Sequence, residues 1–362
     1  MKAALISQGS KSSLMTREAM KKYFQVVDML SLKHLEVSMG KEGGILYEGK
    51  PLPEYDCVYL KGSFRYAYLL RSIAALLEKK VPYMPIPGIS FTTVHNKLLT
   101  HLVLEQHHIP MPKTYVSSTI DSAKDLLKRV KFPIVMKFPE GTQGKGVMFA
   151  DSLSSASSLL DALGVLNQPF IIQEYIETGG CDIRALVVGD KVVAAMRRRS
   201  LTEDKRANIH AGGKGEPIHL TREVINIALD TAKALQADIC GIDILESPTG
   251  PLVIEANVSP GLQGIQEVAI VDVADAIANF LYLKTQTILQ GQKKGEEKKV
   301  MKDMTQTLEN KEGVQEIITT LQFRGERILL PEFITQLAHF EDRKEYVIKA
   351  QKGKIEVKEF KI

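Results

Sequence analysis

The chain has 362 residues, of which 44% are hydrophobic, and its 47 Lys and Arg against 43 Asp and Glu give a net charge of +4. This length allows two or three domains, the hydrophobic fraction excludes a wholly disordered chain, and the charge lacks the excess typical of a nucleic-acid-binding domain. Three cysteines without a C-x-x-C pair argue against a zinc cluster or a disulfide framework, and no run of 18 apolar residues predicts a membrane span, so we expect a cytoplasmic protein.

Short strands and helices alternate over the first 90 residues. This alternation favours an α/β layer with a partly parallel sheet. The segment 82–87 contains three prolines and predicts a connector that ends this first domain, 1–90. The strands are expected at 2–7 and 56–61, and the helices at 14–24 and 64–80.

Residues 91–284 combine helices with paired strands. The strands FPIVMKF, GVMFA, PFIIQEY, IRALVVG and KVVAAMR are followed by CGIDILES and PLVIEAN. Turn residues at 189–190 and 248–250 predict two hairpins among them. The helices are expected at 94–108, 221–237 and 271–283.

The composition changes near residue 285. Residues 285–312 are polar and charged, which predicts a charged linker or a solvated helix. The compact tail, 313–362, begins with a predicted strand, EIITTLQ, and a short helix that starts at Pro331. It ends in a predicted hairpin, EYVIKAQKGKIEVKEF, which turns at Lys352-Gly353.

The glycine-rich segment GTQGKG, residues 141–146, follows a predicted strand and precedes another. Its glycines allow backbone N–H groups to approach phosphates, but the segment fits neither a P-loop nor a dinucleotide-binding pattern. Between two antiparallel strands it predicts a flap, and Lys137 at the end of the first strand is placed to reach a phosphate. A plain hairpin loop with a surface lysine is the alternative.

Oxygen-bearing side chains gather in the last two strands of this region. Glu255 and Asn257 are two residues apart in a strand and therefore share a face. Asp243 lies on the preceding strand, which the turn at 248–250 folds back alongside. Carboxylate and amide oxygens are the ligands that Mg²⁺ prefers, so the three residues predict a metal site. Solvent-facing polar residues on a one-sided sheet are the alternative.

A positive run, MRRRSLTEDKRANIHAGG, covers residues 196–213. Strand alternation places Arg197 and Arg199 on one face and Arg198 on the other, with Arg184 on the neighbouring strand. Guanidinium groups suit the binding of phosphates and carboxylates, although a solvated surface run is the alternative.

Two further features carry weaker signals. The segment QEYIETGGCDIR, residues 173–184, leaves a strand at Glu174-Tyr175-Ile176, where free backbone groups suit an adenine edge. The histidines, His101 among them, show no metal-ligand spacing and are expected to be surface or helix residues, with the exception of His210, which lies in the arginine-rich run.

Six segments occur in the order typical of a known family: K-F-P-E-G-T-Q-G-K-G-V, Q-E-Y-I, C-D-I-R-A-L-V-V-G-D-K-V-V-A-A-M-R-R-R, R-A-N-I-H-A-G-G, G-I-D-I-L and E-A-N-V-S-P-G-L-Q-G-I. Together they resemble the RimK-type ATP-grasp α-L-glutamate ligases, which are similar in fold to glutathione synthetase. The resemblance covers residues 1 to about 284. It implies an α/β (α+β) ATP-grasp fold with an N-terminal α/β pre-ATP-grasp domain, to which a small β-rich tail is added here.

The resemblance implies an ATP-dependent carboxylate–amine ligase. Such an enzyme adds L-glutamate to an acceptor carboxylate through an acylphosphate. The implied ATP-binding residues are Lys97 and Lys137 at the phosphates, Gly141, Gly144 and Gly146 in the flap, Glu174, Tyr175 and Ile176 at adenine, Asp182 near the ribose or adenine, and Arg206, Ala207 and Asn208. Asp243, Glu255 and Asn257 would bind two Mg²⁺ or Mn²⁺ ions, with Glu255 bridging, while Arg184 and Arg199 would hold the acylphosphate or the acceptor.

The sequence departs from the family at three places. Asn96 precedes Lys97 where the family often has Asp, and Lys205 replaces an aromatic residue. Lys61-Gly62 stands where an Arg is common, near the expected acceptor site, which leaves the identity of the acceptor open. The tail, 313–362, is similar to AbrB-like swapped-hairpin modules, which dimerise and often bind DNA; a plain dimerisation or docking module is the alternative, and in either case we expect a dimer or tetramer.

Three functions remain open from the sequence. The acceptor of the glutamate is a protein or peptide C-terminus, as in ribosomal-protein modification, or instead a small coenzyme of the pterin or deazaflavin type or an amino-acid carrier protein. The third is a nucleotide-binding regulatory protein, against which the intact Lys137, Asp243, Glu255 and Asn257 argue. No membrane partner is expected. A nucleic-acid partner is expected only if the tail binds DNA.

Overall fold

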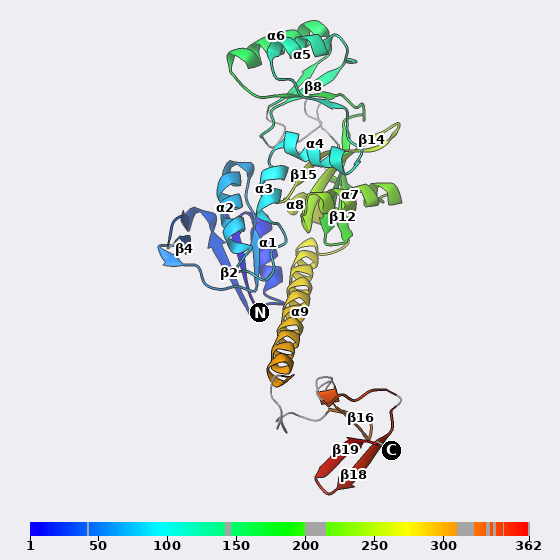
Figure 1. Cartoon of the computed structure of the whole chain (residues 1–362). Helices are drawn as coiled ribbons and strands as arrows, with labels where there is room; N and C mark the ends of the chain where they lie inside the picture. Colours follow the sequence, from blue (N-terminus) through cyan, green and yellow to red (C-terminus); the bar gives the residue numbers. More distant parts are fainter. Residues whose placement is uncertain are drawn as a thin grey trace. The chain divides into compact units, whose positions relative to one another are not determined.

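The computed structural model describes residues 1–41, 43–141, 146–199, 215–309, 322–330, 334–335, 338–342 and 344–360. The chain forms two compact units, Met1–Ile288 and Leu289–Ile362. Figure 1 shows the first unit as an assembly of three sheets with flanking helices and a small antiparallel sheet at its side. No described helix combines the length and the apolar character that a membrane crossing needs.

The first unit begins with a parallel three-stranded sheet in the order β2-β1-β6, which confirms the predicted α/β layer. Its central strand is fully buried over Ala3–Ile6 because four apolar residues follow one another there. The sequence prediction missed β2 and the small sheet β3-β4-β5, whose strands are short and partly exposed. The bounds in this domain are β1 Lys2–Ser7, α1 Lys11–Met20, β2 Val26–Ser31, β3 Leu35–Ser38, β4 Gly44–Tyr47, β5 Lys50–Pro51, β6 Cys57–Leu60 and α2 Ala67–Leu77.

Two helices, α3 (Gly88–Val94) and α4 (Lys97–Gln106), replace the single predicted helix at 94–108. Asn96 separates them because its backbone is extended and its side-chain Oδ1 accepts a 3.2 Å hydrogen bond from the N–H of Leu99. An Asn at this position caps the following helix. Lys97 thereby becomes the first residue of α4.

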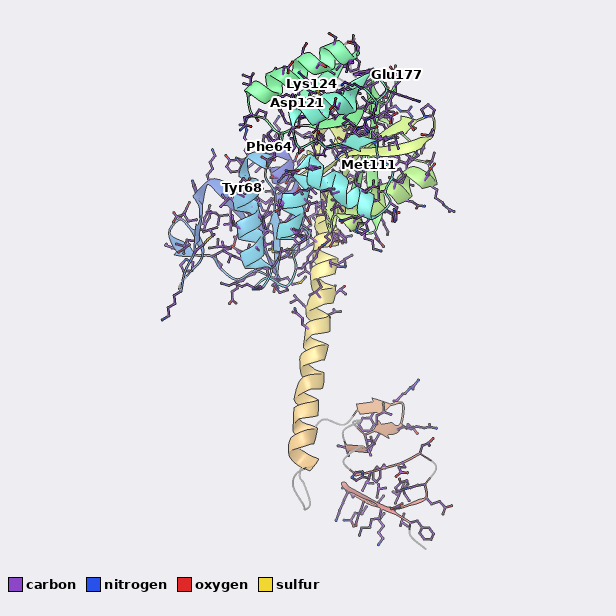
Figure 2. All side chains as sticks on the ribbon, turned by 45° about the horizontal axis from the view of Figure 1, so that its top comes forward. Phe64, Tyr68, Met111, Asp121, Lys124 and Glu177 are labelled. Carbon is purple, nitrogen blue, oxygen red and sulfur yellow. The ribbon has the colours of Figure 1, made fainter. Side chains whose placement is uncertain are left out.

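A four-stranded antiparallel sheet, in the order β7-β10-β8-β9, forms a lobe with its own hydrophobic cluster beneath α5 and α6. The bounds are β7 Thr114–Tyr115, α5 Ile120–Leu127, β8 Ile134–Lys137, β9 Val147–Ala150, α6 Leu153–Val165 and β10 Ile171–Glu174. The two helices are joined by an ion pair between Lys124 and Asp161 at 2.6 Å, and Figure 2 labels Asp121 and Lys124 on α5.

A five-stranded antiparallel sheet, in the order β13-β12-β11-β14-β15, completes the first unit and shares one hydrophobic core with the N-terminal sheet. Both predicted hairpins of this sheet are confirmed, β11 with β12 and β14 with β15. The bounds are β11 Cys181–Val188, β12 Lys191–Arg199, β13 Gly215–Pro217, α7 Arg222–Ala234, β14 Ile239–Ser247, β15 Gly250–Asn257 and α8 Gln263–Val268.

Helix α9, Val273–Glu309, extends well beyond the helix predicted at 271–283 and makes most of the predicted linker 285–312 helical. Its polar stretch is rich in Glu, Lys and Gln, which are good helix formers, so low hydrophobicity alone does not end the helix.

The second unit contains two antiparallel strand pairs, β16 (Gln322–Arg324) with β17 (Arg327–Leu329), and β18 (Tyr346–Gln351) with β19 (Lys354–Glu359). The predicted hairpin that turns at Lys352-Gly353 is confirmed. The predicted helix start at Pro331 and most of the predicted strand EIITTLQ lie outside the described residues.

Candidate active site

One face of the five-stranded sheet carries the predicted metal ligands. Asp243 on β14 lies directly opposite Glu255 on β15 because the register shifts by one residue between Asp243 and Ile244. The unbroken register from the turn at 248–250 would place Ile254 opposite Asp243 and Glu255 on the other face. Asn257 lies opposite Gly241, two positions along the same face. Its Oδ1 accepts a 2.8 Å hydrogen bond from the N–H of Ser259. The structure therefore brings the three oxygen-bearing side chains onto one face.

Two arginines share this face and pair with Asp243. Arg184 on β11 lies opposite Asp243 and binds its carboxylate through two nitrogens, one of them at 2.7 Å. Arg198 on β12 lies opposite Asp182, binds it through two nitrogens, and also reaches Asp243 at 2.9 Å. Asp182 and Asp243 are 3% and 1% exposed. Two buried carboxylates are thus balanced by two guanidinium groups.

The ion pairs set the protonation of this face. Burial works to raise the pKa of Asp243, but the charges of Arg184 and Arg198 outweigh burial and hold that pKa below its usual value. For Asp182 burial prevails, and the nearby Asp243 adds to it, so the pKa of Asp182 is raised although Arg198 binds it. Burial disfavours the charge on Arg198, but the carboxylates of Asp243 and Asp182 outweigh burial and raise the pKa of Arg198 above its ordinary value.

The donor set fits a hard cation, since two carboxylates and one amide oxygen share a face. Within the described residues, no three His, Cys, Asp or Glu side chains form a group that could hold a metal ion. Asp243 is bound by both arginines here, so metal binding at this residue requires a rearrangement of Arg184 and Arg198.

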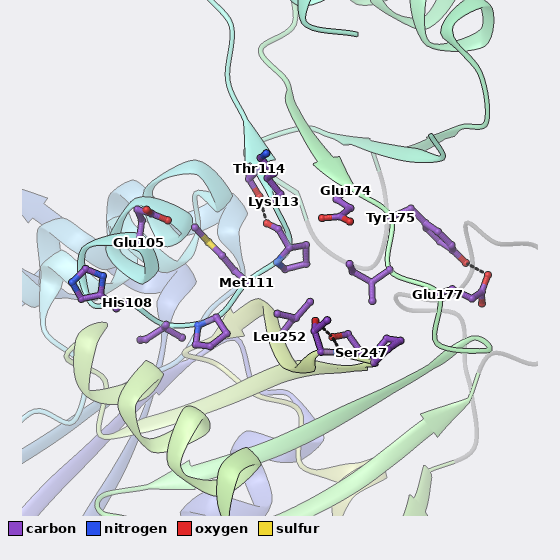
Figure 3. Close-up of a pocket in the computed structure, with 16 residues that line it drawn as sticks. Glu105, His108, Met111, Lys113, Thr114, Glu174, Tyr175, Glu177, Ser247 and Leu252 are labelled. Carbon is purple, nitrogen blue, oxygen red and sulfur yellow. Dashed lines mark hydrogen bonds between the residues drawn. The ribbon is translucent and has the colours of Figure 1, made fainter. Parts of the chain in front are cut away.

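A pocket of about 760 Å³ lies between the four-stranded lobe and the end of the β14–β15 hairpin. Glu174, Tyr175 and Ile176, the residues predicted at adenine, all line it. Figure 3 shows Glu174 and Tyr175 above Leu252, while Met111 approaches from the segment that follows α4. Apolar side chains combined with a few polar groups are typical of a site for a flat heterocycle. Met111 and Leu252 were not predicted, because a single apolar side chain carries no local signal.

The two predicted phosphate lysines lie on neighbouring elements. Lys137, at the end of β8, is 5% exposed and donates a 2.5 Å hydrogen bond to Oε1 of Gln173 on β10. Burial lowers the pKa of Lys137 to about 8, while the charge of Glu255 works in the opposite direction. This influence of Glu255 links the lysine to the carboxylate face. Lys97 donates a 2.8 Å bond to the carbonyl of Gly141 at the start of the glycine-rich segment.

A family model described as a RimK-like ATP-grasp domain matches residues 94–281. A probable α-L-glutamate ligase of Saccharophagus degradans is 34% identical over 287 residues, which cover 78% of this chain and 95% of the relative. The chain belongs to the RimK-like ATP-grasp family.

Solved ATP-grasp structures support the fold. The ATP-grasp ligase PsnB, solved with a phosphomimetic variant of its minimal precursor, Mg and ADP, has a TM-score of 0.61 and 17% identity, covering 78% of this chain and 98% of PsnB. A second PsnB structure, with a precursor peptide and AMPPNP, also has a TM-score of 0.61 and 17% identity, and the match covers 79% of this chain and 98% of PsnB. Both the predicted RimK-like ATP-grasp resemblance and the ATP-grasp fold are confirmed, and the protein is a ligase.

Strand pairing separates the two arginines that the sequence analysis chose for the acyl group. Arg184 lies on the carboxylate face, whereas Arg199 lies opposite Cys181 and is exposed, so strand alternation turns it to the other face. Arg198, which was not chosen, occupies the carboxylate face instead. The cause is a register shift between Leu186 and Val187: Val187 pairs with Val192, but Leu186 pairs with Ala194. An unbroken register would place Arg197 opposite Asp182.

The glycine-rich segment of this RimK-like protein joins β8 to β9, which are antiparallel as the flap prediction requires. Gly141 and Gly146 have φ angles of 147° and 79°, a region that favours glycine. Gly144 lies outside the described residues, as do Arg206, Ala207 and Asn208. Their assignment to the nucleotide stays a prediction.

Proposed function

We propose that this ligase uses ATP to join L-glutamate to a carboxylate of an acceptor protein or peptide, at its C-terminus. The observation that carries the proposal is the carboxylate–arginine face, whose Glu255 acts electrostatically on Lys137, together with the 760 Å³ pocket that Glu174, Tyr175 and Ile176 line. The name of the S. degradans relative supports glutamate as the added amino acid. PsnB, a ligase of similar fold, was solved with a precursor peptide, which supports a peptide acceptor.

In this proposal the nucleotide lies in the pocket against Glu174, Tyr175 and Ile176, with its phosphates at Lys97 and Lys137. Asp182, which the resemblance places near the ribose or adenine, belongs to the buried ion-pair network with Arg198. Phosphoryl transfer depends on positioning and charge neutralisation rather than on a covalent side chain. The buried Lys137 suits this role because an anion compensates the charge that burial disfavours.

The residues that would hold the metal are Asp243, Glu255 and Asn257. They would bind two Mg²⁺ ions, or Mn²⁺ in place of Mg²⁺. A bound cation would neutralise charge on the transferred phosphoryl group. Arg184 and Arg198 then hold the acceptor carboxylate or the acylphosphate, replacing our sequence-based choice of Arg199.

The bond changes follow in two steps. An acceptor carboxylate oxygen attacks the γ-phosphorus of ATP, ADP leaves, and an acylphosphate forms. The amino nitrogen of glutamate then attacks the acyl carbon, inorganic phosphate leaves, and the nitrogen loses a proton as the amide forms. Exclusion of water protects the acylphosphate from hydrolysis between the two steps.

The direct test measures ADP release with Mg-ATP and L-glutamate against pools of peptides and of small carboxylate coenzymes, with products identified by mass spectrometry. We expect acceptor-dependent ADP release and the gain of one glutamate residue at a peptide C-terminus. Gain on a coenzyme alone would overturn the peptide acceptor but keep the ligase. Gain of a different amino acid would overturn glutamate.

The metal assignment is tested by Glu255→Gln. This change keeps the shape of the side chain but removes its charge, so we expect turnover to fall by about a thousandfold. Glu246→Gln is the matched control, because Glu246 lies on the other strand of the same hairpin, is half-exposed and pairs with Arg197 at the surface. Equal activity of the two variants would contradict the assignment.

A further inference from the structure

A continuous chain of hydrogen bonds joins the ammonium group of Lys137 to the backbone carbonyl of Lys97 through residues that have no assigned role. Lys137 Nζ donates to Gln173 Oε1 at 2.5 Å, and Gln173 Nε2 lies 2.9 Å from His101 Nε2. His101 Nδ1 lies 2.5 Å from the backbone carbonyl of Lys97, one turn earlier on α4. His101 and Gln173 are 3% and 2% exposed. The expectation that His101 is a plain surface or helix residue is therefore incomplete.

The direction of every bond in the chain follows from Lys137. An ammonium group only donates, so the amide oxygen of Gln173 must face Lys137 and its nitrogen must face His101. His101 Nε2 therefore accepts, and Nδ1 carries the proton that is donated to the carbonyl of Lys97. Burial lowers the pKa of His101 to about 4, which keeps the ring in this neutral form at neutral pH.

The same amide also reaches the nucleotide pocket. Gln173 Nε2 donates a second bond, at 2.8 Å, to Oγ1 of Thr114, which lines the pocket and in turn donates to the carbonyl of Pro112. Gln173 thus connects β8, α4 and β7 with both of its N–H groups and its oxygen. A fully satisfied buried network of this kind fixes the rotamers of its members.

We propose that His101 and Gln173 are positioning residues that hold Lys137 and Lys97 in the arrangement that receives the phosphates of ATP. His101 fixes the orientation of the Gln173 amide, and the amide fixes the ammonium group of Lys137. This inference rests on the proposed function, because it takes the two lysines as phosphate ligands.

The test compares the binding of ATP with that of adenosine, which lacks phosphates, to the full chain. Gln173→Met keeps the length of the side chain without its hydrogen bonds, and His101→Leu removes the acceptor that orients the amide. We expect the Kd for ATP to rise about 10- to 100-fold in both variants. We expect the Kd for adenosine to stay within about twofold in His101→Leu, since His101 does not line the pocket.

Two further variants separate positioning from general stability. His101→Gln supplies an oxygen near the place of Nε2 and should recover much of the ATP affinity. Thr231→Val is the matched control, because it removes a fully buried hydrogen bond, from Oγ1 to the carbonyl of Ile227 on α7. We expect it to lower the melting temperature without changing the preference for ATP over adenosine.

The outcomes are distinguishable. Equal loss of ATP and adenosine binding in His101→Leu, or unchanged ATP binding in both variants, overturns the positioning role. Failure of the wild-type chain to bind ATP instead contradicts the proposed function itself. Wild-type ATP binding without ligation of any acceptor would overturn the proposed reaction while the positioning role is still decided by the variants.

Discussion

The two sides of the site hold buried charge in different ways. On the five-stranded sheet, the carboxylates of Asp182 and Asp243 are bound by Arg184 and Arg198, so each charge meets an opposite charge. On the four-stranded lobe, Lys137 is similarly buried, but its ammonium group donates a hydrogen bond to the neutral amide of Gln173. The first side is internally compensated, whereas the second carries the lysine that we propose receives the phosphates of ATP.

This difference indicates how stability and function are divided. The ion-pair network is strongly coupled, and removal of one member leaves another buried charge without its partner. Lys137, by contrast, destabilises the folded protein as long as it is charged and no anion binds, because burial disfavours its ammonium group. Perturbed groups of this kind are common in active sites.

Arg198→Met should have the largest effect on stability and would break the compensated side. It leaves Asp182 without its guanidinium partner, so we expect the free energy of unfolding to fall by about 3–5 kcal/mol. Arg197→Met is the matched control one residue away, since its pair with Glu246 is partly exposed and contributes about 0–1 kcal/mol. Chemical denaturation measures both, and similar losses would contradict the comparison.

Lys137→Met should stabilise the folded protein, whereas Arg198→Met destabilises it. Removing the buried charge is expected to raise the free energy of unfolding by about 1–3 kcal/mol at pH 7, while ATP binding is lost. The folded-state pKa of about 8 lies below the ordinary 10.5, so the unfolded chain holds the proton between these values and the stability of the wild type rises with pH there. The gap between variant and wild type should therefore close from pH 8 to 10.5, and a constant gap would exclude Lys137 as its source.

The affinity for ATP should fall as pH rises through about 8, by up to about tenfold per pH unit, because Lys137 loses its charge. Isothermal titration calorimetry with ATP across this range measures the effect. Lys61→Met is the control, since burial likewise lowers the pKa of Lys61 to about 8. If Lys61→Met abolished the inflection, the assignment to Lys137 would be wrong.

Gly146→Ala, at the end of the glycine-rich segment, should affect stability through the backbone rather than through charge. A Cβ there would clash with the ring of Phe138, and the φ angle of 79° disfavours other residues, so we expect the free energy of unfolding to fall by about 1–3 kcal/mol. Gly179→Ala has a similar φ of 61° but no atom within 4 Å of the added Cβ. Thermal unfolding should therefore show a smaller loss of stability for Gly179→Ala than for Gly146→Ala. The difference between the two variants measures the contribution of the contact with Phe138.

The sequence by itself determined the elements with a strong local pattern. The two hairpins of the five-stranded sheet follow from their turn residues, and the shared face of Glu255 and Asn257 follows from strand alternation. Asp243 joins that face only through the register shift between Asp243 and Ile244, which no local pattern indicates. The short, partly exposed β2 and the break at Asn96 were missed, because weak apolar patterns and a single capping residue are poor signals in isolation.

The tertiary structure alone decided which charged groups meet. A one-residue register shift at Leu186–Val187 places Arg198, rather than Arg197 or Arg199, beside Asp182 and Asp243. Likewise, His101 and Gln173 are 72 residues apart and meet because the fold brings α4 and β10 within hydrogen-bond distance at this point. Local sequence encodes the periodicity of a strand or helix, but the register between strands and the contacts between distant elements depend on the packing of the whole domain.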